Sequence, residues 1–122
     1  MDIPRFSDEE VEQIIAWNAP ARLSLVPLSL SLHHPKLHWA IGKCINLANH
    51  PDPIVRGNAL QAFGHFARRF RTAHRNLVEP LIQTALKEKN KYIRESALTA
   101  ADEIDAYCTW KVNRKPNDKR TL

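Results

Sequence analysis

The chain has 122 residues, enough for one domain with a hydrophobic core. Its apolar fraction of 43% and charged fraction of 25% are ordinary for a globular protein, and no apolar run approaches the roughly 18–20 residues that span a bilayer. The two cysteines are not spaced as a CxxC pair and are expected to be reduced, and three glycines argue against a glycine-rich phosphate loop. The N-terminus lacks the pattern of a secretory signal, so we expect a cytoplasmic protein with no membrane partner.

The net charge of +5 is distributed unevenly along the chain. Residues 1–19 carry five acids against one base, whereas residues 20–75 carry eight bases against one acid. Residues 111–122 carry five bases against one acid. A basic middle and tail beside acidic helices suits either a nucleic acid or an acidic protein as the partner.

The first part of the chain predicts two helices. Ser7-Asp8-Glu9-Glu10 is a capping box, and the helix behind it ends at residues 18–20. The residues expected on its buried face are Val11, Ile14, Ile15 and Trp17. Leucines alternate with serines in part of residues 21–34, as in a strand, but a lone strand would have no partner in this sequence. We therefore predict a second helix, bent at Pro27 because proline removes a backbone hydrogen bond.

Four further helices follow in the rest of the chain. Apolar residues at helical spacing predict a third helix after His34-Pro35, and Asp52 followed by Pro53 predicts the start of a fourth. Asn76 is expected to cap a fifth helix, and a sixth follows the polar turn at residues 87–91. Six helices make three antiparallel hairpins in a single domain over residues 1–110. Residues 111–122 are predicted to form a mobile basic tail.

A stretch of the sequence occurs twice, 38 residues apart. Residues 52–66 and 90–104 align in register, with these pairs in common: Val55/Ile93, Arg56/Arg94, Ala59/Ala97, Leu60/Leu98, Ala62/Ala100 and Phe66/Ile104. A helix–turn–helix unit reused at a fixed period indicates a helical solenoid, which commonly serves as a binding surface.

The repeated unit resembles the HEAT repeat family. Asp-Pro-Ile-Val-Arg-Gly-Asn-Ala-Leu at residues 52–60 is the most specific part, and the likeness covers roughly residues 36–108. It implies an all-α fold, a short right-handed α-solenoid of about three hairpins. It also implies that Arg56 and Arg94 tie adjacent repeats together by pairing with a turn aspartate, which Asn90 replaces in the last repeat.

The sequence offers little support for catalysis or metal binding. His34 and His38 stand four residues apart, but Pro35 lies between them and no further ligand stands at metal-binding spacing. No glycine-rich loop, HExxH motif or nucleophile context is present. We expect no enzymatic activity, no cofactor and no metal, and we expect Trp110 to cover the open end of the core.

The face formed by the second helices of successive repeats is the predicted site for a protein partner. Its residues are Asn58, Gln61, His65, Arg68, Arg69, Glu95, Thr99, Asp102 and Glu103. One half of this set is basic and the other acidic. The positions at which the two copies differ, among them Asn58 against Ser96 and His65 against Glu103, are expected to carry specificity.

Among small stand-alone proteins the chain looks most like a bacterial immunity protein of the contact-dependent growth inhibition type. That resemblance implies a monomer that binds and blocks a cognate secreted toxin, with nucleases as one class of such toxins. Two alternatives stay open. The basic middle and tail, with Arg68, Arg69, Arg71 and Arg75 close together, could bind nucleic acid, or the chain could be a small assembly or adaptor protein.

Overall fold

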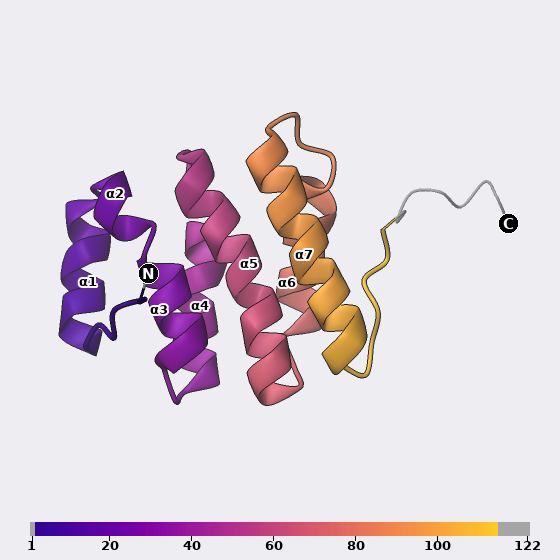
Figure 1. Ribbon diagram of the computed structural model, residues 1–122, viewed down its shortest axis with the longest axis horizontal. Helices are drawn as coiled ribbons and strands as arrows, with labels where there is room; N and C mark the ends of the chain where they lie inside the picture. Colours follow the sequence, from indigo (N-terminus) through magenta and orange to yellow (C-terminus); the bar gives the residue numbers. More distant parts are fainter. Residues whose placement is uncertain (1, 115–122) are drawn as a thin grey trace, which may run out of the picture.

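The computed structural model describes residues 2–114, and every regular element in this range is a helix (Figure 1). The elements are α1 (Asp8–Trp17), α2 (Pro20–Leu23), α3 (Val26–His33), α4 (Leu37–Leu47), α5 (Pro53–Phe70), α6 (Arg75–Ala85) and α7 (Lys91–Tyr107). No helix in this part of the chain is both long and apolar enough to cross a bilayer. The all-α prediction is confirmed.

The helices stack as hairpins in two layers. Helices α3, α5 and α7 lie side by side across Figure 1, with α4 and α6 behind them and α1 at one end of the stack. Contacts between α5 and α7 are the most extensive in the molecule, followed by those between α3 and α5. The three-hairpin solenoid expected from the repeat is therefore the observed architecture, and α3, α5 and α7 are its second helices.

The first hairpin differs from the prediction in where its chain breaks. Residues 21–34 are helical as expected, but they form two helices separated at Ser24 and Leu25. The predicted bend at Pro27 is wrong, because Pro27 lies in the first turn of α3. An N–H group in the first turn has no partner within the helix, so proline costs no hydrogen bond there.

Local capping signals were good predictors of helix starts, with one exception. Ser7 Oγ accepts from the Glu10 amide at 3.1 Å and Glu10 Oε1 accepts from the Ser7 amide at 2.8 Å, which is the predicted capping box. The Asp52 carboxylate accepts from two amides of the first turn of α5, at 3.0 and 3.1 Å. The prediction that Asn76 caps the fifth helix is wrong. Helix α6 begins at Arg75, because the backbone turns at His74, whose φ is 48°.

The core lies between the two layers and is filled by aliphatic residues and by Phe63 and Phe66, which are fully buried. Cys44 is also fully buried, and Cys108 is half-buried; neither forms a disulfide. Burial raises the pKa of both thiols, so each is held as a neutral, weakly nucleophilic group. The expectation of two reduced cysteines agrees with this arrangement.

Residues 111–114 pack against the last hairpin. Val112 is only 5% exposed, and its amide donates to Asp105 Oδ1 at 2.8 Å. Arg114 donates to Asp105 Oδ2 at 2.7 Å, and Trp110 lies against the core as expected. The predicted mobile tail is therefore wrong for residues 111–114, because α7 supplies a carboxylate that fixes their backbone. The remainder of that tail lies outside the described residues.

Candidate partner-binding surface

The repeated arginines serve the framework, as the resemblance implied, but with different partners. The Arg56 guanidinium on α5 pairs with the Glu88 carboxylate in the turn before α7, which ties two successive hairpins together. Asp52 is instead occupied by the α5 amides. Arg94 donates to the carbonyls of Glu88 and Lys89 at 2.9 and 3.2 Å and so closes its own turn.

Two of the predicted contact residues are used inside the molecule. Asn58 is 6% exposed; its amide nitrogen donates to the Ser24 carbonyl at 2.8 Å and its oxygen accepts from the Tyr92 hydroxyl. Gln61 donates to the Tyr92 hydroxyl at 3.1 Å and to Ser96 Oγ at 2.9 Å. This network joins α5 to the helices on both of its sides, so its polar atoms are satisfied within the fold.

A second network connects the C-terminal half of α5 to α3. His65 Nδ1 lies 3.0 Å from Ser31 Oγ, and Arg69 donates to the carbonyls of Ser31 and His34 at 2.8 and 2.9 Å. Burial lowers the pKa of His65, and the positive charge of Arg68 lowers it further. His65 and Arg69, both predicted to meet a partner, therefore hold the end of α3 in place.

The remaining predicted residues leave an exposed strip on α7. Arg68 pairs with Glu103 at 3.6 Å, and Asp102 pairs with Arg114 at 2.8 Å. Glu95 and Thr99 are exposed on the same helix. Leu98, 47% exposed, lies on this helix too. The predicted face is thus brought together as one layer, and its α7 side, Arg68 and Arg69 are its parts open to solvent. Partner binding at these residues stays a prediction.

Two pairs of positions at which the repeat copies differ lie at contacts between successive hairpins. Asn58 on α5 meets the chain before α3, and its counterpart Ser96 on α7 meets Gln61 of α5. His65 meets Ser31 of α3, and its counterpart Glu103 meets Arg68 of α5. Each of these four residues therefore contacts the preceding hairpin.

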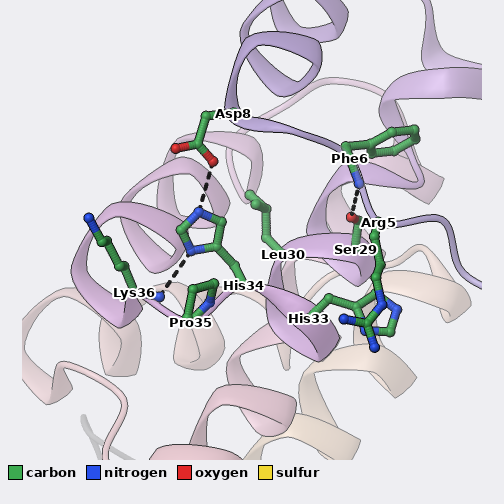
Figure 2. Close-up of a pocket in the computed structure, with 9 residues that line it drawn as sticks. All are labelled: Arg5, Phe6, Asp8, Ser29, Leu30, His33, His34, Pro35 and Lys36. Atoms are coloured by element: carbon green, nitrogen blue, oxygen red, sulfur yellow. Dashed lines mark hydrogen bonds and ion pairs between the residues drawn. The ribbon is translucent and has the colours of Figure 1, made fainter.

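A cavity of about 330 Å³ lies where the N-terminal segment crosses the end of α3 (Figure 2). The Phe6 amide donates to Ser29 Oγ at 3.1 Å on one side of it. On the other side His34 Nδ1 accepts from the Lys36 amide at 3.0 Å, so the ring proton lies on Nε2, 2.9 Å from Asp8 Oδ1. Figure 2 shows both bonds of this imidazole. The cavity is lined by Arg5, Phe6, Asp8, Ser29, Leu30, His33, His34, Pro35 and Lys36.

The histidine pair considered as a metal site has separate partners. His34 is engaged by Asp8 and stacks on Trp39 with ring centroids 4.9 Å apart, whereas His38 makes an edge contact with His74 at 4.8 Å. Among residues 2–114 no group of three or more His, Cys, Asp and Glu side chains is placed to hold a metal ion.

The sequence did not predict that the tryptophan at the end of α1 is exposed. Trp17 was predicted to share the buried face of Val11 and Ile14, but its side chain is 74% exposed. At about 100° per residue, Trp17 lies roughly 90° from the midpoint of Val11 and Ile14, and so beyond the edge of that apolar stripe. The helical angle was therefore the signal that could have placed it on the surface.

Comparison with known proteins supports the fold. A family model described as HEAT repeat matches residues 40–70, which cover α4 and α5. No curated protein matches the sequence. A chain in the crystal structure of a CDI complex from Cupriavidus taiwanensis LMG 19424 has a similar structure, with a TM-score of 0.75 and 18% sequence identity. The match covers 88% of this chain and 95% of that one. Residues 40–70 thus match the HEAT repeat, and the fold of the chain is similar to that of a chain in the CDI complex.

Proposed function

We propose that this chain is a non-enzymatic protein-binding module, an immunity protein that binds and blocks a cognate toxin of a contact-dependent growth inhibition system. The observation that carries the proposal is the fold-wide likeness to a chain of a CDI complex, which extends over 95% of that chain. The proposed mechanism is steric occlusion by a monomer in the cytoplasm, without cofactor or metal.

The state of the basic side chains favours a protein partner over a nucleic acid. Arg69 is committed to two backbone carbonyls, and Arg75 pairs with Glu79 at 3.2 Å. Arg71 lies 5.0 Å from the ring centroid of Tyr107. Phosphate contacts need guanidinium groups free to reach a backbone, and single-strand binders add exposed aromatic rings. The nearby Phe63 and Phe66 are buried and supply no such platform.

A rescue experiment tests the proposal. The toxin domain encoded beside the gene for this chain is induced in cells that carry the wild-type chain, a Phe63→Asp variant or an empty vector. We expect growth to be restored only by the wild type, and toxin and wild-type chain to copurify in equal amounts. Absence of both rescue and copurification contradicts the proposal. Tight binding of RNA or DNA that weakens steeply with salt would favour the nucleic-acid alternative instead.

A further inference from the structure

The corner between α1 and α2 exposes a set of apolar residues around a hollow. Trp17 is 74% exposed, the highest value among the large apolar side chains of the described chain that reach the surface. Ala16, Pro20 and Ala21 are exposed beside it in sequence. The hollow has a volume of about 180 Å³ and is lined by Glu10, Gln13, Ile14, Trp17 and Arg22. An indole at the rim of a small hollow is typical of an interface anchor.

Folding of the chain does not account for the position of this indole. Trp17 is the last residue of α1, and the helix is already ended by Asn18, whose backbone is left-handed and whose amide bonds to the Ile14 carbonyl. Ile14, 6% exposed, closes the floor of the hollow. The Arg22 guanidinium, which also lines the hollow, lies 5.1 Å from the centroid of the Phe6 ring.

The charged residues near the corner between α1 and α2 indicate the chemistry of a partner that would cover this corner. The N-terminal region has five acids against one base. Glu12 pairs with Lys43 at 2.8 Å and Asp8 with His34, whereas Glu9 is exposed and makes no ion pair in the described structure. A surface that places cations against α1 and an apolar group against Trp17 complements both features.

We propose that Trp17 is the central anchor of the partner interface, and that the partner presents a basic surface patch to α1. The inference rests on the proposed function, since the partner is the cognate toxin. It places the interface at the end of the solenoid, beyond the α3, α5 and α7 layer predicted from the sequence. An arginine or lysine stem of the partner could lie against the indole at the hollow, and a second cation of the partner could face Glu9, about two turns away on α1.

The affinity of Trp17→Ala for the toxin domain, measured by calorimetry, tests the proposal. The matched control is Leu98→Ala, which removes an exposed apolar side chain from α7. Alanine is a good helix former, and both variants are expected to keep the wild-type melting temperature within a few degrees. We expect the Trp17 variant to bind about 30-fold or more weakly and the Leu98 variant to bind like the wild type.

A charge pair of variants tests the chemistry of the partner. Glu9→Gln is expected to weaken binding by about two- to fivefold at low salt, and to weaken it more than Glu95→Gln on α7 does. Equal binding by Trp17→Ala and the wild type overturns this inference while the proposed function stands. If Leu98→Ala and Glu95→Gln lose more affinity than Trp17→Ala and Glu9→Gln, the interface lies on α7, and the inference is overturned as well. A wild-type chain that neither binds nor rescues overturns both.

Discussion

The ring of Tyr92 on α7 occupies the space that a β-carbon at Gly57 of α5 would need. The absence of a side chain at Gly57 therefore lets the two helices approach closely and places the Tyr92 hydroxyl against the buried Asn58. Gly57 differs in this from Gly42 of α4, where an added β-carbon meets nothing within 4 Å. The same amino acid thus has a packing role in one helix and none in another.

The substitutions Gly57→Ala and Gly42→Ala should change the free energy of unfolding in opposite directions. Gly57→Ala is expected to lower the free energy of unfolding by about 1–2 kcal/mol, because overpacking outweighs the gain in helix propensity. Gly42→Ala should raise it by up to about 1 kcal/mol. Urea denaturation followed by circular dichroism measures both. A stabilised Gly57→Ala variant would show that the Tyr92 ring moves aside without cost.

The contact between Asn58 and Tyr92 should be energetically coupled. Asn58→Ala leaves the Ser24 carbonyl and the Tyr92 hydroxyl without this partner, and we expect a loss of about 2–3 kcal/mol. Tyr92→Phe removes the hydroxyl alone and should cost about 1 kcal/mol. The loss in the double variant should fall short of the sum by at least about 0.5 kcal/mol, which a double-mutant cycle measures. Strict additivity would contradict the network.

Stability should fall in acid partly because of His65. Burial and Arg68 lower the pKa of this imidazole in the folded protein. As pH drops through the ordinary value of about 6.5, the unfolded chain takes up the proton first, so the free energy of unfolding decreases until the folded pKa is passed. His65→Gln removes this titration. The difference in unfolding free energy between pH 7.5 and 5.5 should be smaller in the variant, and an equal difference would count against the assignment.

The segment after α7 should contribute to stability through Asp105. Asp105→Ala removes the acceptor of the Val112 amide and the partner of Arg114, and we expect a loss of about 1–3 kcal/mol. Lys111→Ala is the matched control, because the exposed Lys111 ammonium reaches only a backbone carbonyl and should change stability by less than about 0.5 kcal/mol. Hydrogen exchange adds a direct test: the Val112 amide should be protected in the wild type and exposed to exchange in Asp105→Ala.

Elements whose signals are local could be predicted from the sequence. Ser7 and Asp52 cap helices with their own side chains, within three residues, so the pattern alone predicts the start of each helix. Asn76 has the same chemistry but lies inside α6, because the backbone turn at His74 starts that helix earlier. The repeat register likewise predicted the stacking of α5 and α7, since four of the six shared pairs lie in the core: Val55/Ile93, Ala59/Ala97, Ala62/Ala100 and Phe66/Ile104.

The candidate surface could be predicted only in part, because periodicity does not distinguish solvent from a neighbouring helix. Asn58 and Gln61 stand at positions that would be open on an isolated α5, but the chain before α3 covers Asn58 and helix α7 contacts both. The partner of Arg56 was missed for a related reason: Glu88 lies 32 residues away and meets it only after the hairpins stack. Trp17 was missed because its apolar character outweighed its helical angle in the prediction.

The contacts between successive hairpins also determine the order in which the hairpins can stack. Asn58 needs the Ser24 carbonyl before it, and Glu103 needs Arg68. If a second copy of the α4–α5 hairpin were inserted after α5, the His65 of that copy would stand opposite Arg68 in the place of Glu103. A carboxylate that attracts Arg68 would then be replaced by an imidazole that repels it when protonated. The hairpins are therefore not interchangeable modules. Each hairpin carries polar groups that match those of its own neighbour. The stack is therefore limited to one order of hairpins, although two of them share a repeated sequence.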